Sequence, residues 1–308
     1  MQIKKFQLAR DLPNLEAYLV HQYAVNQNAS SWLPERLHDM IYRMAAQEEE
    51  RSMDYIFLWE EAEKIVACIL PDGENIYISI QGGFESLYPS VLAYSEQHCL
   101  PLFHRAEDGS VKFWVAAHDS LPYMRDTLLN AGYARYPEED YANFVLPLES
   151  CLPIALPEGF LLLYGEDYAN EQNKWSACSL GFHPDREAPD YVTDMAPYLS
   201  RKNSSLYPDS FECIVVDQTA QQGNDVCAYC FVYVDKQTNT AFIEPVSTRE
   251  KYQRKGIGTA MMHGVIQRCK TLGIEKCYVN SFGWRRKFYN AAGFLTEDTI
   301  GFWYKTIP

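Results

Sequence analysis

The sequence predicts an α/β (α+β) protein made of two tandem halves, in which strands and helices follow one another in nearly the same order. The chain has 308 residues, 47% of them hydrophobic, enough for two packed domains of about 150 residues each. Segments rich in β-branched and aromatic residues alternate with segments of helical periodicity. Each half also closes with a helix followed by glycine and an aromatic residue, at Leu129–Tyr133 and Asn290–Phe294. This repeated signature favours internal duplication over coincidence.

The first half is expected to contain two helices, three successive strands, a helix, a strand, a helix and a closing strand. The second of these helices is predicted because Leu37, Ile41 and Met44 fall on one side at helical spacing. In chain order the expected elements cover residues 13–24, 34–50, 55–59, 64–70, 75–80, 88–99, 111–116, 123–130 and 142–146.

The second half repeats this order, starting with a strand and two helices. Two strands then form an antiparallel hairpin about the polar turn 235–240. The long helix that follows ends near Gly273, a residue typical of helix C-termini. The expected elements are residues 160–164, 167–180, 188–203, 210–216, 226–234, 241–246, 256–272, 276–279, 285–292 and 301–305.

Residues 148–159 separate the two halves. They contain two prolines and a glycine, and the periodicity pauses there. We therefore expect two domains, residues 1–148 and residues 155–308.

The composition argues against several classes of function. The formal net charge is −14, whereas nucleic-acid binding needs a cationic surface that replaces counterions. No apolar run approaches the roughly 20 residues that span a bilayer, and the N-terminal residues lack the apolar core of a secretory signal. The nine cysteines are scattered and odd in number, as expected of free thiols in a reducing compartment. We expect a cytoplasmic protein that binds neither nucleic acid nor membrane.

One cysteine pair, Cys227 and Cys230, has the spacing of a metal or redox motif. No second pair supplies the remaining ligands that zinc needs. Residues three apart on a strand also point to opposite faces of the sheet. We therefore expect packed strand cysteines and no metal.

The strongest candidate site lies where a strand near residues 242–246 leads through a loop into a helix that begins at Gly256. Unpaired backbone N–H groups and the helix dipole at such a start suit a diphosphate. Gly256 and Gly258 remove side chains where an anion must approach closely. Positive charge is concentrated around them, at Arg249, Lys251, Arg254 and Lys255. The glycine spacing alone fits a phosphate site and a tight strand-to-helix turn equally well, and it matches neither a Walker loop nor the dinucleotide-binding motif.

A wider pattern resembles the GNAT acetyltransferase superfamily. Its residues are Gln253-x-x-Gly256-x-Gly258 after a strand, with Phe288-Tyr289-x-x-x-Gly293-Phe294 downstream. The segment 244–259 is similar to the family's fourth strand and third helix, and the two halves resemble tandem GNAT proteins. The resemblance implies two GNAT-like domains, each a mixed, mainly antiparallel twisted sheet flanked by helices. Residues 80–89 occupy the same place in the first half without the motif or any basic residue, which implies a degenerate N-terminal copy.

The resemblance also implies a cosubstrate, acetyl-CoA, and direct transfer of its acetyl group to an amine in a ternary complex. The acceptor is expected to be a small-molecule amine or a peptide. In the family the pantetheine arm lies along the fourth strand and the pyrophosphate lies at the start of the third helix. Carried onto this chain, the coenzyme-binding residues are Val246, Ser247, Thr248, Gln253, Arg254, Lys255, Gly256, Ile257, Gly258 and Thr259.

Two residues are candidates for the proton transfers. Tyr289 matches the family tyrosine that acts as the acid toward the departing thiolate, and its alternative role is an aromatic residue of an amphipathic helix. Glu244, on the strand that carries the coenzyme, would remove a proton from the amine directly or through water. Its alternative is an outward-facing strand glutamate.

This sequence departs from the family pattern after the fifth strand. Phe282 and Arg285 occupy positions where related sequences often carry other residues, so the contacts of that loop with coenzyme are in doubt. Phe282 and Trp284 either wall an acceptor pocket or pack in the core. The alternative function is a non-catalytic acyl-CoA-binding or regulatory module, and an aminoacyl-tRNA-using transferase fits poorly with the acidic chain and the intact motif.

Overall fold

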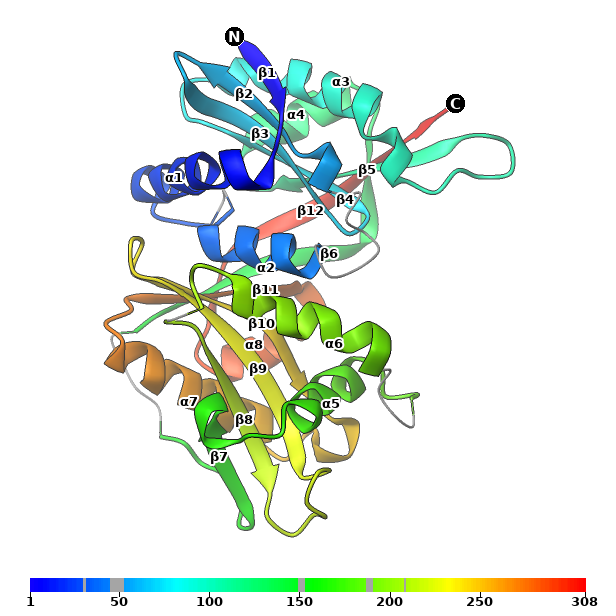
Figure 1. The fold of residues 1–308 in the computed structure, drawn as a ribbon. Helices are drawn as coiled ribbons and strands as arrows, with labels where there is room; N and C mark the ends of the chain where they lie inside the picture. Colours follow the sequence, from blue (N-terminus) through cyan, green and yellow to red (C-terminus); the bar gives the residue numbers. More distant parts are fainter. Residues whose placement is uncertain (30–31, 45–52, 149–152, 187–190, 208) are drawn as a thin grey trace.

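The computed structural model describes residues 1–29, 32–44, 53–148, 153–186, 191–207 and 209–308. Within them, a 12-stranded sheet runs through both halves of the molecule and helices cover both of its faces (Figure 1). The strand order is β1-β2-β3-β4-β5-β12-β6-β11-β10-β9-β8-β7. The mixed, mainly antiparallel sheet expected from the sequence is confirmed, because the parallel pairs described are β4 with β5 and β10 with β11.

The first half contains each element expected among the described residues. These are β1 (Gln2–Lys5), α1 (Leu8–Asn26), α2 (Pro34–Met44), β2 (Phe57–Glu61), β3 (Lys64–Asp72), β4 (Asn75–Ile80), α3 (Tyr88–His98), β5 (Val111–His118), α4 (Pro122–Asn130) and β6 (Ala134–Pro147). Strand β1 is additional, and residues 45–50 of the second expected helix lie outside the described part of the chain. Strand β6 begins at Ala134 rather than Ala142 because its polar first part pairs with β12.

The second half also follows the expected order. Its elements are β7 (Phe160–Tyr164), α5 (Glu171–Phe182), α6 (Tyr191–Ser200), β8 (Phe211–Asp217), β9 (Val226–Asp235), β10 (Thr240–Thr248), α7 (Ile257–Thr271), β11 (Lys276–Phe282), α8 (Arg286–Ala291) and β12 (Leu295–Ile307). The antiparallel β9–β10 hairpin is confirmed. Part of the expected helix at 188–203 lies outside the described residues, as do residues 149–152 of the join. Short 3-10 turns are η2 (Glu85–Leu87), η3 (Leu100–Leu102), η4 (Gly165–Asp167), η5 (Arg201–Asn203), η6 (Glu250–Tyr252) and η7 (Gly283–Arg285).

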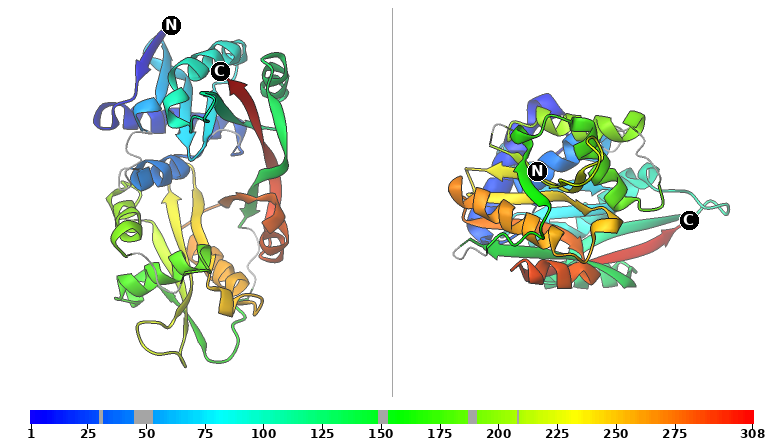
Figure 2. Two further views of the ribbon diagram at one scale, coloured as in Figure 1. Left: turned by 90° about the vertical axis from the view of Figure 1, so that its right-hand side faces the viewer. Right: turned by 90° about the horizontal axis from the view of Figure 1, so that it is seen from below.

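The closing strands of the two halves are exchanged. Strand β6 of the first half pairs with β11 of the second, from Pro147 opposite Lys276 to Tyr141 opposite Phe282. Strand β12 of the second half pairs with β5 of the first. The two closing strands also pair with each other and run together along one side of the molecule (Figure 2, left). The sheet is therefore continuous across the predicted domain boundary.

Each half packs helices on opposite faces of the shared sheet. Leu15 of α1 and Leu37 of α2 belong to one apolar cluster of the first half, and Leu128 of α4 belongs to another. Helix α2 also contacts α6, β9 and β10, so it lies at the junction of the halves (Figure 1). Among the described helices, none is both long and apolar enough to cross a membrane.

Strands β10 and β11 separate near the middle of the second half. Their parallel pairing covers Thr240–Phe242 and Lys276–Tyr278. Beyond it, the pairing of β10 with β9 is interrupted between Ile243 and Val246, where Pro245 has no N–H to donate to a neighbouring strand. Strand β11 continues instead beside β6. The separated strands make room for the candidate site.

Candidate functional site

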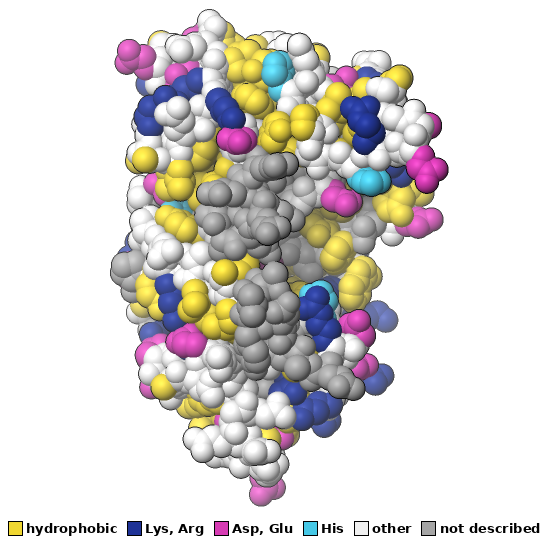
Figure 3. Space-filling view, turned by 45° about the vertical axis from the view of Figure 1, so that its right-hand side comes forward, with side chains coloured by type: hydrophobic (Ala, Val, Ile, Leu, Met, Phe, Trp, Pro, Cys, Tyr) yellow, Lys and Arg dark blue, Asp and Glu magenta, His cyan; other side chains and the backbone are white. Residues whose placement is uncertain are grey.

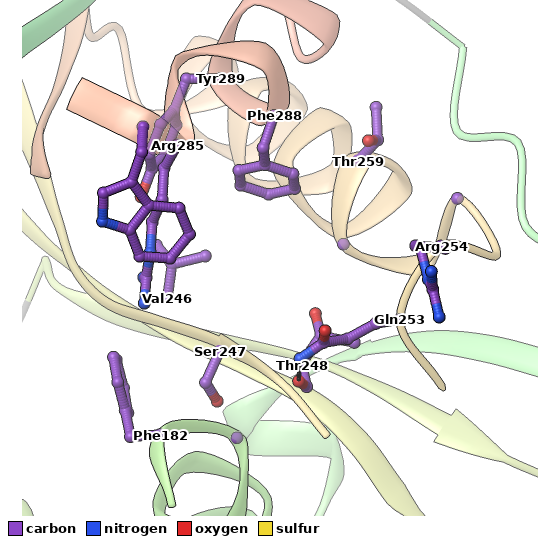
Figure 4. Close-up of a pocket in the computed structure, with 14 residues that line it drawn as sticks. Phe182, Val246, Ser247, Thr248, Gln253, Arg254, Thr259, Arg285, Phe288 and Tyr289 are labelled. Carbon is purple, nitrogen blue, oxygen red and sulfur yellow. Dashed lines mark hydrogen bonds between the residues drawn. The ribbon is translucent and has the colours of Figure 1, made fainter. Parts of the chain in front are cut away.

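A pocket of about 380 Å³, here called the cradle pocket, lies between the end of β10 and the starts of α7 and α8. Phe182, Val246, Arg285 and Tyr289 lie at one end of it, and Gln253, Arg254 and Thr259 lie at the other (Figure 4). Its complete lining is Gly181, Phe182, Val246, Ser247, Thr248, Gln253, Arg254, Gly256, Gly258, Thr259, Trp284, Arg285, Phe288 and Tyr289.

The glycines at the start of α7 have different physical roles. Gly256 is the N-cap residue and adopts the left-handed conformation, with φ of 81°. Gly258 allows close approach, because a Cβ there would lie 3.1 Å from both Phe288 Cε2 and Thr248 Oγ1. No described side chain caps the helix. The first N–H groups of α7 are therefore available to a ligand that enters the pocket.

Most of the predicted coenzyme-binding residues line this pocket. The exceptions are Lys255 and Ile257, and the Ile257 side chain is 1% exposed and packs in the apolar core. Gln253 Nε2 donates to the Thr248 carbonyl at 2.9 Å, which ties the loop to the end of β10.

The four basic residues near the motif have different surroundings, and one of them, Arg254, lines the pocket. Arg249 Nη1 instead donates to Asn224 Oδ1 at 2.6 Å, and the Lys251 ammonium lies 4.8 Å from the centre of the Tyr252 ring. Basic side chains gather on the right of the lower part of the molecule in Figure 3, on a chain that is acidic overall. The expected local positive charge is therefore present, but Arg254 is the member that lines the pocket.

Tyr289 is 2% exposed and its ring stacks on Phe144 of β6, with 4.7 Å between ring centres. Burial raises the pKa of Tyr289 to about 12, although a hydrogen bond with the Ser281 side chain opposes the shift. The phenol is therefore protonated at neutral pH. An aromatic residue from the exchanged strand fixes the ring in place.

Glu244 lies in the irregular segment of β10 and faces a second space, here called the interhalf cavity. Burial raises the pKa of Glu244 to about 7. Asp39 raises it further, whereas Arg201 and Arg43 lower it. Glu244 forms no hydrogen bond or ion pair with the described residues. Its carboxylate can therefore exchange a proton near neutral pH.

The interhalf cavity has a volume of about 500 Å³ and receives side chains from both halves. The first half contributes α2 and the β3–β4 turn, and the second half contributes β10, β11 and η7. The residues are Arg36, Asp39, Arg43, Asp72, Gly73, Glu74, Asn75, Tyr77, Tyr141, Phe182, Phe242, Glu244, Val246, Asn280, Ser281, Phe282, Arg285 and Tyr289.

The cradle pocket and the interhalf cavity meet. Phe182, Val246, Arg285 and Tyr289 line both spaces. A ligand that extends from the start of α7 toward Tyr289 therefore comes close to the interhalf cavity, whose lining includes Glu244. Such a junction suits transfer of a group between two bound molecules.

The aromatic residues considered as pocket walls have separate positions. Phe282 lines the interhalf cavity and packs against Tyr141, with ring centres 4.5 Å apart. Trp284 is 72% exposed and lines the cradle pocket. Both residues therefore face a cavity. Cys227 and Cys230, in contrast, are buried in β9, and the described residues contain no group of three or more potential metal ligands.

Sequence reasoning missed the residues that the first half contributes to the interhalf cavity. Arg36, Asp39 and Arg43 are polar residues on an amphipathic helix, a pattern typical of a solvated face. Their contribution depends on α2 packing against the second half, which no local motif signals.

A family model described as the acetyltransferase (GNAT) family matches residues 172–294. No curated protein sequence matches the chain. Among solved structures, a tandem GNAT protein from the clavulanic acid biosynthesis pathway is similar over 99% of this chain and 98% of its own, with a TM-score of 0.66 and 12% identity. A GCN5-related N-acetyltransferase from Sphaerobacter thermophilus is similar over 99% and 95%, with a TM-score of 0.64 and 13% identity. These similarities show the fold of the whole chain.

Proposed function

Because residues 172–294 form a domain of the GNAT acetyltransferase family, we propose that this protein is an acetyl-CoA-dependent N-acetyltransferase. The acetyl group passes directly to an amine while both substrates are bound. The observation that supports this most strongly is the junction of the two cavities at Tyr289, with Glu244 in the wall of one of them.

The cradle pocket binds the coenzyme in this proposal. Its pyrophosphate accepts hydrogen bonds from the backbone at the start of α7, and the Arg254 guanidinium adds positive charge. The pantetheine arm pairs with β10 from Val246 to Thr248, on the edge that β11 leaves free beyond Phe242. The acetyl group then lies near Tyr289, at the end of the pocket that opens into the interhalf cavity.

Glu244 is the proposed base. An acceptor ammonium gives one proton to Glu244, directly or through water, and becomes a neutral nucleophile. The amine nitrogen then attacks the thioester carbon. A carbon–nitrogen bond forms and the carbon–sulfur bond breaks, while the proton lost from the attacking nitrogen balances the one that coenzyme A gains as a thiol.

Tyr289 is the proposed acid toward the sulfur. The pKa of Tyr289 is about 12, whereas that of a thiol in water is about 8.5. Complete proton transfer from the phenol to a solvated thiolate is therefore unfavourable. Donation of a hydrogen bond by Tyr289 as the sulfur acquires charge stabilises the transition state at lower cost.

The first half is proposed to bind no coenzyme. Its loop between β4 and α3 contains no basic residue, and the carboxylate of Glu85 accepts a hydrogen bond from the Gly83 amide at 3.0 Å. That contact gives the amide an anionic partner within the chain itself. A phosphate would have to compete with Glu85 for it and would meet its negative charge.

Two measurements on the same protein test the proposal. Isothermal titration with acetyl-CoA should give binding with one site per chain. Free-thiol release should then depend on both acetyl-CoA and an amine from a broad panel. Absence of binding at millimolar acetyl-CoA contradicts the proposal, and two sites per chain contradict the assignment of the first half.

The same measurements separate an enzyme from the alternative function. A non-catalytic acyl-CoA-binding module would bind the coenzyme but release no thiol with any amine. Transfer that requires aminoacyl-tRNA, with acetyl-CoA inert, would indicate a different class of transferase.

A further inference from the structure

A buried network of ion pairs adjoins the interhalf cavity, and Arg36, Asp39, Arg43 and Asp72 of this network line the cavity. Asp72 contacts Arg43 at 2.5 Å and Arg36 at 3.4 Å. Asp39 contacts Arg201 at 3.2 Å and Arg43 at 3.6 Å. Three guanidinium groups thus share these two carboxylates, and Glu244 is a further carboxylate on which Asp39, Asp72, Arg43 and Arg201 act.

Arg36 has donor groups to spare. It is 8% exposed, and its guanidinium lies 4.2 Å from the centre of the Trp32 ring and 4.6 Å from that of Tyr77. Its contact with Asp72 is long, and its other hydrogen-bond partner among the described residues is the Tyr77 side chain, so these two contacts do not use all five of its N–H groups. The two rings fix the plane of the guanidinium beside the cavity, which suits recognition of a planar or tetrahedral anion.

Arg285 supplies a second positive group, from the opposite half of the molecule. It forms no hydrogen bond or ion pair with the described residues. Its guanidinium lies 4.8 Å from the centre of the Trp284 ring and 6.0 Å from that of Phe182. Figure 4 shows Arg285 near Val246, at the end of the cradle pocket that joins the interhalf cavity.

The acidic residues of the cavity differ in how they are paired. Asp39 and Asp72 are each held by two arginines, and Glu74 is exposed at the β3–β4 turn. Glu244 forms no ion pair with the described residues, and the proposed mechanism assigns it to the acceptor ammonium. Among the described residues, the cavity therefore offers the Glu244 carboxylate for a cation and the Arg36 and Arg285 guanidinium groups for an anion.

We propose that the acceptor is a small amine that also carries an anionic group, held by Arg36 and Arg285 while its amino group faces Glu244. This inference rests on the proposed acetyltransferase function and assigns the substrate class of the same site. The shared chemistry is an oxyanion, either a carboxylate or a phosphate-type group, because both accept the paired N–H groups of arginine.

A panel of matched amines tests this assignment through thiol release from acetyl-CoA. Each set contains an amino acid, its primary amide, the corresponding decarboxylated amine and the aminophosphonate. We expect an anionic member to exceed its neutral and cationic partners in kcat/KM by at least about 10-fold, since one buried charge-assisted contact is worth roughly 1.5–3 kcal/mol. A faster aminophosphonate would identify a phosphate-type group rather than a carboxylate.

Three variants connect the preference with the arginines. Arg36→Gln and Arg285→Gln should each raise the KM of the preferred anionic amine by about 10-fold, with a smaller effect on kcat and little effect on the neutral amide. Arg36→Lys keeps the positive charge but loses the paired N–H groups of the guanidinium, so it should give an intermediate KM. Arg125→Gln, which changes an exposed arginine of α4, is the matched control.

The outcomes separate this inference from the function on which it rests. Preference for neutral or cationic amines would overturn the anionic acceptor and leave the acetyltransferase intact. An Arg285→Gln enzyme that binds acetyl-CoA more weakly but keeps its acceptor preference would overturn the role of Arg285. Coenzyme binding without thiol release from any amine would overturn the proposed function itself.

Discussion

The two halves of this protein end in the same local structure but carry different chemistry at one position. In the first half, Tyr133 N donates to the Leu128 carbonyl at 2.9 Å, and in the second half Phe294 N donates to the Tyr289 carbonyl at 3.0 Å. The glycine before each aromatic residue, Gly132 or Gly293, has a positive φ. Leu128 thus occupies the place of Tyr289.

The loops that precede α3 and α7 also differ in the charged residues that they place near the helix start. Neither helix start has a side-chain cap, but the α7 loop places Arg254 beside its helix start. The α3 loop holds Glu85 on the Gly83 amide. The halves thus share their local fold and differ in a few residues, which under the proposed function would decide which half binds the coenzyme.

Dividing the chain tests most strongly whether the two halves are separate units, and it should have the largest effect. Residues 155–308 alone would leave β12 without β5 and β6, and β11 without β6. Phe144 would also be missing from the ring of Tyr289. We expect this fragment to show no acetyl-CoA binding by titration calorimetry, because unpaired strands leave their backbone groups and apolar faces exposed.

Co-expression of residues 1–154 with the fragment is the control, and it should restore binding. An isolated fragment that binds acetyl-CoA with the affinity of the full chain would show that the exchanged strands are dispensable for the site.

Tyr289→Phe tests the position at which the halves differ most. The variant keeps the ring that stacks on Phe144 and removes the hydroxyl that is proposed to donate to the thioester sulfur. We expect kcat to fall by roughly 100-fold or more, with the acetyl-CoA dissociation constant within about twofold of wild type. Thiol release and calorimetry measure the two effects.

Tyr133→Phe is the matched control from the first half. Its hydroxyl donates to Glu96 at 2.9 Å, outside the cradle pocket and the interhalf cavity, so kcat should not change. A Tyr289→Phe enzyme as fast as wild type would remove the hydroxyl from the mechanism.

Glu244→Gln tests the interhalf cavity, the proposed acceptor site, which side chains of both halves line. The wild-type carboxylate accepts a proton when it is ionised, so kcat/KM should fall as the pH drops through about 7, the raised pKa of Glu244. The groups that set this pKa are Asp39, Arg43, Asp72 and Arg201. The variant should lose roughly 10- to 100-fold in kcat/KM at pH 8.

The variant should also lose the dependence on pH in this range. Glu107→Gln, at an exposed position in the first half, controls for the change of charge. A variant that retains the wild-type pH profile would show that another group titrates.

Local sequence patterns predicted much of this molecule, because helices, strands and hairpins depend on periodicity and turn residues close in the chain. The cradle was predictable for the same reason, since Gln253, Gly256 and Gly258 lie within one loop and helix start. The exchange of β6 and β12 was not predictable, because it pairs residues far apart whose alternation suits either partner. The interhalf cavity depends on that arrangement. No sequence pattern therefore indicated that Arg36 and Arg285, which are far apart in the chain, line the same cavity.

The smallest expected effect compares a glycine in the first turn of α7 with a glycine in the loop before α3. Gly258→Val should raise the acetyl-CoA dissociation constant by about 10-fold, because its Cβ would lie 3.1 Å from Phe288 and Thr248 and its methyl groups would narrow the cradle pocket, where the coenzyme is proposed to bind. Gly82→Val adds the same side chain to the first-half loop, where a Cβ meets nothing within 4 Å. Calorimetry should show unchanged acetyl-CoA binding for Gly82→Val. If this variant weakened binding as much as Gly258→Val, the first half would have to contact the coenzyme, and the single-site assignment would be wrong.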